Sequence, residues 1–131
     1  MKLFTLEEAN ALIPKLQATF TEIHNLRTGL SLLEPYLRPA RERAQWGGGS
    51  AQGVQFVRLT ERFGAILRRV EAMGVLLKDL DDGLFDFPYR LDGRIVLLCW
   101  KHGEDQIDWY HDIDTGFAGR KPLPKGPERF A

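Results

Sequence analysis

The spacing of the apolar residues changes once along the chain, and this change most constrains the fold. In two segments before residue 80, apolar residues recur every three or four positions, the period of a helix packed lengthwise on another helix. After Asp81-Asp82-Gly83 they recur at every second position, as in a strand with one buried face. The sequence therefore predicts an α+β fold, in which a hairpin of two long antiparallel helices packs on a small three-stranded antiparallel β-meander.

Turn and capping residues give boundaries for a single domain with five parts. The expected parts are helix 1 at 1–34, a Pro- and Gly-rich loop at 35–52, helix 2 at 53–80, the β-meander at 84–113, and a glycine-containing turn with a Pro-rich tail at 114–131. Thr5-Leu6-Glu7-Glu8 has the form of a capping box, which satisfies two free backbone N–H groups where helix 1 begins. Pro14 lies inside that helix and removes one backbone hydrogen bond, so we expect a kink there.

Two hairpins set the register of the meander. Asp92-Gly93 is typical of the type I′ turn of a two-residue hairpin, which places Asp86 directly opposite Cys99. A second tight turn over 102–105 would return the third strand with His111 on the aromatic face, away from Cys99. The partners expected across this second hairpin are Trp100–Ile107, Leu98–Trp109 and Val96–His111. A shift of one residue would exchange the faces of whichever strand moved.

The composition excludes several classes of protein. Lys plus Arg and Asp plus Glu both number 18, so the formal net charge is zero, which argues against a polybasic nucleic-acid binder. No apolar run approaches the roughly 20 residues that a membrane helix needs. The single cysteine, Cys99, rules out an internal disulfide and fits a reducing compartment. Glu7 and Glu8 interrupt any signal-peptide core, so we expect a cytoplasmic protein with no membrane partner.

A metal site is the sharpest chemical hypothesis. His111, Glu104, Cys99 and Asp114 lie close together in the sequence, and imidazole, carboxylate and thiolate suit Zn²⁺ or another divalent transition ion. Their spacing matches no established zinc-finger or zincin motif, and the expected register separates Cys99 from His111. The alternative for His111 is a core histidine with satisfied hydrogen bonds. We therefore predict no obligatory cofactor, with zinc as the candidate.

A site for a small anion or a phosphorylated ligand is a second hypothesis. Arg94 and Arg120 supply positive charge, and Gly116 and Gly119 flank a turn whose N–H groups would form an anion-binding nest. The alternative is that Arg120 pairs with a nearby carboxylate and closes the tail against the sheet. Arginines between 38 and 69 form a basic region for weak nucleic-acid contact, but no recognised nucleic-acid-binding motif accompanies them.

Catalysis finds less support in the sequence. In the row Asp86–Cys99–Asp108, the two carboxylates would raise the pKa of the thiol, whereas a reactive cysteine needs cationic neighbours. The chain also lacks a serine on a nucleophile elbow. We predict no catalytic residues, and the sequence does not favour an enzyme.

The favoured interpretation is a structural or interaction module that forms a homodimer. Leu12, Leu26 and Leu33 widen the apolar stripe of helix 1 beyond the seam that faces helix 2. A single hairpin would leave part of this stripe uncovered. Two hairpins packed together as a four-helix layer would bury it, so these leucines are the predicted interface.

Several short motifs along the chain carry a family resemblance. They are Phe4-Thr5-Leu6-Glu7-Glu8-Ala9-Asn10, Gly74-Val75-Leu76-Leu77-Lys78-Asp79-Leu80, Asp86-Phe87-Pro88, Leu98-Cys99-Trp100 with Gly103-Glu104, and His111 followed by Gly116-Phe117-Ala118-Gly119-Arg120. With these motifs the chain resembles a prokaryotic family catalogued only as domain of unknown function 2203. The resemblance covers nearly the whole chain and implies a small bacterial cytoplasmic protein. It implies no activity, because none is established for the family.

Overall fold

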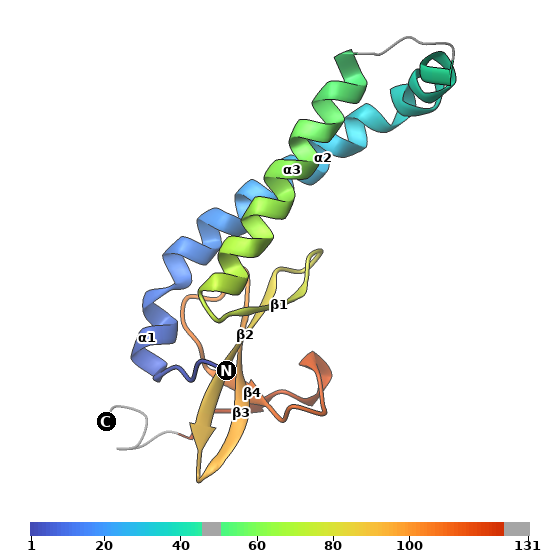
Figure 1. The fold of residues 1–131 in the computed structure, drawn as a ribbon. Helices are drawn as coiled ribbons and strands as arrows, with labels where there is room; N and C mark the ends of the chain where they lie inside the picture. The colour runs from blue at the N-terminus through green and yellow to red at the C-terminus, as the bar shows by residue number, and fades with distance from the viewer. Residues whose placement is uncertain (46–50, 125–131) are drawn as a thin grey trace. The chain divides into compact units, whose positions relative to one another are not determined.

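The computed structural model describes residues 1–45 and 51–124, with the backbone alone for 37–45. Its elements are α1 (Leu6–Ala11), α2 (Ile13–Gln45), α3 (Ala51–Ala72), β1 (Leu76–Asp79), β2 (Leu84–Leu91), β3 (Arg94–Lys101), β4 (Trp109–His111), the 3-10 helix η1 (Phe117–Gly119) and β5 (Lys121–Pro122) (Figure 1). The α+β class and the two long helices are confirmed. The contacts divide the chain into a helical unit, Thr19–Arg69, and a sheet unit formed by residues 1–18 and the chain from Val70 onward.

The predicted capping box begins the first helix. The Thr5 hydroxyl accepts from the N–H of Glu8 at 3.0 Å, and the Glu8 carboxylate accepts from the N–H of Thr5 at 2.8 Å. The backbone hydrogen bond from Thr5 also lowers the pKa of Glu8, because it favours the ionised carboxylate. The first helix therefore starts where the sequence places it.

The helix is interrupted at Leu12, two residues before the expected kink at Pro14. The N–H of Leu12 bonds to the carbonyl of Ala9 at 3.1 Å, a tighter turn than in an α-helix, and α2 starts anew at Ile13. Pro14 thereby lies in the first turn of α2, where a backbone N–H has no partner within the helix. The break thus accommodates the proline at a lower free-energy cost than a kink inside one continuous helix.

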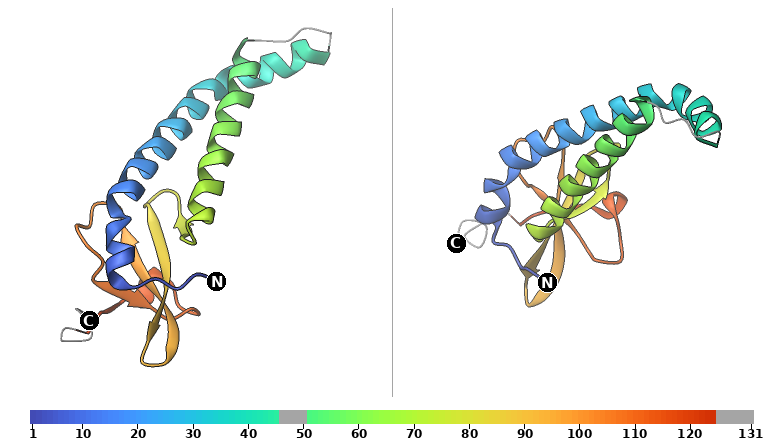
Figure 2. Two further views of the ribbon diagram at one scale, coloured as in Figure 1. Left: turned by 60° about the vertical axis from the view of Figure 1, so that its left-hand side comes forward. Right: turned by 45° about the horizontal axis from the view of Figure 1, so that its top comes forward.

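The predicted loop over 35–52 is wrong at both ends. Helix α2 continues through Pro35 and Pro39 to Gln45, and α3 begins at Ala51; the Gly-rich stretch at 46–50 lies outside the described residues. A proline removes one hydrogen bond and bends a helix without necessarily ending it. The last turns of α2 bend away from the turns before them in this way (Figure 2).

Within the helical unit, α2 and α3 run antiparallel. Glu22 of α2 bonds to Arg69 of α3 at 3.1 Å, and further along α2 a Cβ added at Gly29 would lie 3.3 Å from the side chain of Leu59. Because one contact joins the start of α2 to the end of α3 and the other joins residues nearer the connection, the helices pair as a hairpin. Of the side chains described in this unit, the buried apolar ones are Ile23, Leu26, Leu33 and Ile66.

Helix α3 ends eight residues before the predicted boundary at residue 80, and a strand replaces the last part. The N–H groups of Met73 and Gly74 bond back to Val70 and Glu71, and Gly74 has the left-handed φ of +84° that commonly ends a helix. The chain then turns into β1, which pairs with β2 through Leu76 opposite Asp86. The short apolar run after Gly74 is therefore strand rather than helix.

The sheet has five antiparallel strands in the order β1-β2-β3-β4-β5, rather than the three expected. The first predicted hairpin is confirmed: Leu91 pairs with Arg94, and Asp86 pairs with Cys99. Asp92 and Gly93 both take positive φ, as a type I′ turn requires. On one face of this hairpin, aromatic and aliphatic side chains form the core against the start of the chain. These are Phe85, Phe87, Val96, Leu98 and Trp100, with the Phe4 ring 5.4 Å from that of Phe87.

The second predicted hairpin is wrong by one residue. His111 pairs with Leu97 instead of Val96, and Trp109 pairs with Cys99 instead of Leu98. The connection between Lys101 and Trp109 is longer than a tight turn. Within it, Ile107 is fully buried and its N–H bonds to the Asn10 side chain at 2.8 Å. Strand β4 therefore starts only at Trp109, and each of its side chains lies on the face opposite to the one expected.

The junction between α3 and β1 yields a stability prediction. Gly74→Ala is expected to lower the free energy of unfolding by about 2 kcal/mol, because alanine is strained at this φ. Its Cβ would also lie 2.9 Å from Cβ of Lys2. Gly93→Ala is the control, since its φ of +81° is similar and its added Cβ meets nothing within 4 Å. Urea unfolding compares the two, and equal losses would contradict the role of close packing at Gly74.

Candidate functional site

Three buried polar residues from adjacent strands meet on the sheet face opposite the aromatic core. Asp86 of β2, Cys99 of β3 and His111 of β4 are 2%, 1% and 3% exposed respectively. One potential ligand atom from each lies within 4.8 Å of the other two. Asp86 and Cys99 are direct cross-strand partners, and the observed register of β4 brings His111 to their face. This Asp86–Cys99–His111 cluster is the candidate functional site.

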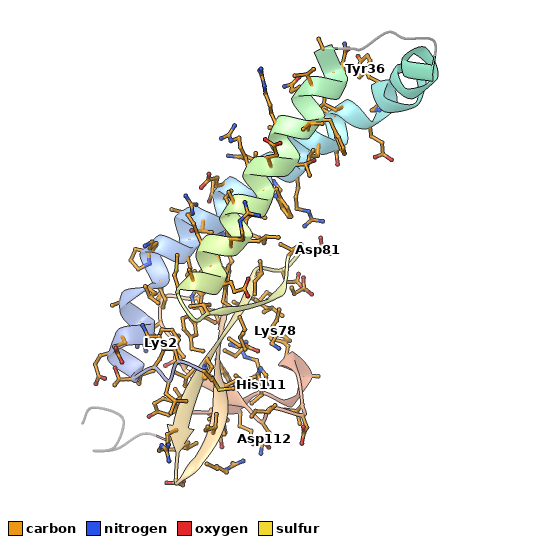
Figure 3. All side chains as sticks on the ribbon, in the orientation of Figure 1. Lys2, Tyr36, Lys78, Asp81, His111 and Asp112 are labelled. Atoms are coloured by element: carbon orange, nitrogen blue, oxygen red, sulfur yellow. The ribbon has the colours of Figure 1, made fainter. Side chains whose placement is uncertain are left out.

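The imidazole of His111 is held at both ring nitrogens (His111 is labelled in Figure 3). Its Nδ1 lies 2.8 Å from the main-chain carbonyl of Asp112, and its Nε2 lies 2.9 Å from Oδ2 of Asp86. A carbonyl can only accept, so Nδ1 must donate its proton there. The Nε2–Asp86 hydrogen bond then needs one further proton, which the imidazole and the carboxyl share.

Burial shifts the pKa of each of the other two members. It raises the pKa of Asp86, although the neighbouring His111 acts in the opposite direction. Burial, reinforced by the Asp86 carboxylate, raises the pKa of the Cys99 thiol to about 12. At neutral pH Cys99 is therefore a thiol and a poor nucleophile in the metal-free protein. A coordinated metal ion would change this, because it deprotonates a ligating thiol outright.

Of the four predicted metal ligands, the structure brings only Cys99 and His111 together. Glu104 lies outside the cluster, where its carboxylate accepts from the N–H of Lys101 at 2.7 Å. Asp114 is exposed and also lies outside it. Asp86, which sequence reasoning placed opposite Cys99 but did not count as a ligand, is the third member. The available signal was the single acidic residue of the strand, which stands between the apolar Phe85 and Phe87.

The two arginines of the predicted anion site have carboxylate partners. Arg94 pairs with Asp112, and Arg120 donates through Nη2 to both carboxylate oxygens of Glu104, at 2.8 and 3.0 Å. The Arg120–Glu104 pair is the alternative that the sequence had left open. Gly116 precedes η1 and Gly119 is its last residue, but the N–H of Gly119 bonds to the carbonyl of Gly116 at 2.9 Å. That N–H is therefore not directed at an external anion.

The three predicted interface leucines lie mostly inside the chain. Leu26 and Leu33 are 4% and 8% exposed within the helical unit, and Leu12 in the sheet unit is half-buried. Among the side chains that the structure describes in the helical unit, the large apolar ones left exposed are Leu32, Tyr36, Val54 and Val57. Leu26 and Leu33 of α2 are thus already used by packing within one chain.

Comparison with known proteins identifies the family. The model of an uncharacterised conserved protein family, DUF2203, matches residues 2–123. The chain belongs to the DUF2203 family. No curated protein and no solved structure gives a significant match to this DUF2203 protein. Among the described residues, no helix combines the length and apolar character needed to cross a membrane.

The cluster predicts different effects for two substitutions. His111→Ala is expected to lower the free energy of unfolding by about 3 kcal/mol, because it leaves the Asp86 carboxyl buried without its partner. Asp86→Asn is expected to cost about 1 kcal/mol or less, because the asparagine amide can donate to Nε2 of His111. Urea unfolding followed by tryptophan fluorescence measures both. Equal losses would contradict the proposed hydrogen-bond roles.

Proposed function

We propose that this DUF2203 protein binds one divalent transition-metal ion, with Zn²⁺ as the best fit, through Asp86, Cys99 and His111. The observation that carries the proposal is the convergence of their carboxylate, thiol and imidazole within 4.8 Å on a buried sheet face. Zinc binds oxygen, sulfur and nitrogen ligands at about 2.0–2.3 Å, so ligand atoms around it lie roughly 3–4 Å apart. Small side-chain movements would bring the three atoms to these distances.

The orientation of His111 supports this assignment. A metal-binding histidine usually donates its second ring N–H to a carbonyl or carboxylate, which fixes the tautomer and aims the free nitrogen at the ion. Nδ1 of His111 makes this bond to the Asp112 carbonyl, and Nε2 faces Asp86. The ion would take the place of the proton that His111 and Asp86 share.

Charge and ligand chemistry restrict the ion. Asp86 and Cys99 would each contribute one negative charge as ligands and His111 none, so a divalent ion would leave no net charge in the buried site. A thiolate ligand favours zinc and similar ions over Mg²⁺ and Ca²⁺, which prefer oxygen. Three protein ligands also leave a fourth position for water or another small ligand, as in zinc sites that are not purely structural.

Metal content tests the proposal directly. Native mass spectrometry of protein purified without chelator or nickel affinity resin should show one added zinc per chain. Substitution with Co²⁺ should give a thiolate charge-transfer absorption that Cys99→Ser abolishes. Asp86→Asn should weaken Zn²⁺ binding by at least about 100-fold while the fold persists.

The matched control is Asp114→Asn, which removes the same charge from an exposed residue outside the cluster. It should bind Zn²⁺ like the parent chain. A parent chain that takes up neither Zn²⁺ nor Co²⁺, or an Asp86→Asn variant that binds as tightly as the parent, would refute the metal centre.

The helical unit supports a second proposal, self-association through the helices. Leu32 and Tyr36 of α2 are 69% and 55% exposed, and Val54 and Val57 of α3 are 52% and 53% exposed. These four large apolar side chains lie towards the connection between α2 and α3. A second copy of the chain would bury them in a homodimer, using surface that Leu26 and Leu33 do not provide.

Leu32→Glu should then raise the dissociation constant of the dimer by at least about tenfold, because a charge would have to be buried in the interface. Native mass spectrometry over a dilution series measures the dimer fraction. Ile113→Glu is the control, since it places the same charge on an exposed apolar residue of the sheet unit. A monomeric parent chain, or equal dimer fractions for both variants, would count against this interface.

A further inference from the structure

The three proposed ligands are closed off from solvent. Asp86, Cys99 and His111 are each at most 3% exposed, so an ion from solution cannot reach them without movement of whatever covers them. Entry of a metal ion rests on the proposed metal site, but the burial of these three side chains does not depend on a metal. It applies equally to a small reagent directed at the Cys99 thiol.

The covering segment is the chain that follows β4. Lys101 and Trp109 lie on the same face as Cys99, because Trp109 is its direct cross-strand partner and Lys101 follows two residues later. The Phe117 ring lies 5.6 Å from the Lys101 ammonium, and the Arg120 guanidinium stacks over the Trp109 ring at 5.1 Å. Residues of this segment therefore lie across the face that holds the cluster.

Arg120 is the main attachment of this segment near Cys99. Its Nη2 bonds to both carboxylate oxygens of Glu104, and it lies 3.4 Å from the main-chain carbonyl of Cys99. The guanidinium also stacks on the Phe117 ring at 4.6 Å, and the side chain is only 12% exposed. Its Nε is buried and has no hydrogen-bond partner among the described residues, a cost that opening the segment would relieve.

The rest of the segment makes few contacts, and Leu123, which is 5% exposed, is its one buried side chain. It returns to the sheet through β5, which has two residues, and through a bond of 2.8 Å from the N–H of Leu123 to the carbonyl of Asp108. The Lys121–Asp112 ion pair lies at the surface, with side chains 51% and 31% exposed, and such pairs contribute little. Segments with few buried contacts open at much lower free energy than the core of a domain.

We infer that residues 112–123 form a strap that must lift to admit an ion to Asp86, Cys99 and His111, and that the Glu104–Arg120 ion pair is its latch. The strap controls the rates at which the metal enters and leaves. It has a smaller effect on the equilibrium affinity, because Glu104 and Arg120 are not ligands.

Labelling of Cys99 by iodoacetamide in the full-length, metal-free protein tests the strap without depending on metal binding. Arg120→Met keeps an apolar chain between Trp109 and Phe117 but breaks the latch, and should raise the labelling rate about tenfold. A cation beside a thiol favours the reactive thiolate, so loss of the Arg120 charge alone would slow labelling. Arg90→Met, an exposed arginine on β2, should leave the rate unchanged.

A second variant opens the strap without altering charge. A Cβ at Gly119 would lie 2.6 Å from Cβ of Thr115, whereas one at Gly116 would meet nothing within 4 Å. Gly119→Ala should therefore speed labelling, and Gly116→Ala should not. Hydrogen exchange separates local opening from unfolding: amides of β4 should exchange faster in Gly119→Ala, while those between β2 and β3 keep their protection.

The outcomes distinguish this inference from the proposed function. Unchanged labelling in both Arg120→Met and Gly119→Ala, or exchange that rises equally in all strands, would overturn the strap. Faster labelling in a chain that binds no Zn²⁺ would retain the strap and refute the metal centre. In a chain that binds Zn²⁺, stopped-flow Co²⁺ uptake should also be about tenfold faster in Arg120→Met, and an unchanged uptake rate would overturn control of metal entry.

Discussion

One hydrogen bond between distant parts of the chain determines which residues share the candidate site. The side chain of Asn10 in α1 accepts from the N–H of Ile107 at 2.8 Å, and the Ile107 side chain is fully buried. Together these interactions hold the connection between β3 and β4 against the first helix, so that β4 begins at Trp109. Since side chains alternate along a strand, this starting point places His111 on the face of Cys99 and Asp86. A connection shorter or longer by one residue would turn His111 to the opposite face and dismantle the cluster.

Local signals in the sequence predicted the parts of the fold that depend on local conformation. Thr5 and Glu8 cap the first helix as expected, and Asp92-Gly93 fixes the β2–β3 register through positive φ at both residues. Gly74 carries the same kind of information, since its left-handed conformation ends α3, but its apolar neighbours fit a helix and a strand equally well. The β4 register could not be found in this way, because it depends on a contact across 97 positions of the chain. No turn motif encodes such a contact.

The sequence likewise predicted one part of the candidate site and missed the part that depends on distant contacts. The chemical types of its side chains were visible in the sequence, and Cys99 and His111 were named among the candidates. Which carboxylate completes the set depends on geometry: Glu104 follows β3 closely in sequence but is held by Arg120, whereas Asp86 lies directly across the sheet from Cys99. Sequence proximity favoured Glu104 over Asp86, because neighbours across a sheet are distant along the chain. The observed register also removes the objection that Cys99 and His111 point to opposite faces.

The cluster satisfies its own hydrogen bonds and charges without a metal, and for this reason access through the proposed strap matters. In small zinc-dependent domains the ion supplies the folding free energy, and the ligands are disordered until it binds. Here the Asp86 carboxyl and the His111 imidazole already satisfy each other with a shared proton, and the Cys99 thiol is neutral, so the face can be buried at little electrostatic cost. On our proposal, metal binding therefore exchanges protons for an ion within a sheet that has already folded. The barrier to that exchange lies in uncovering the ligands, and this is the step that the contacts of Arg120 oppose.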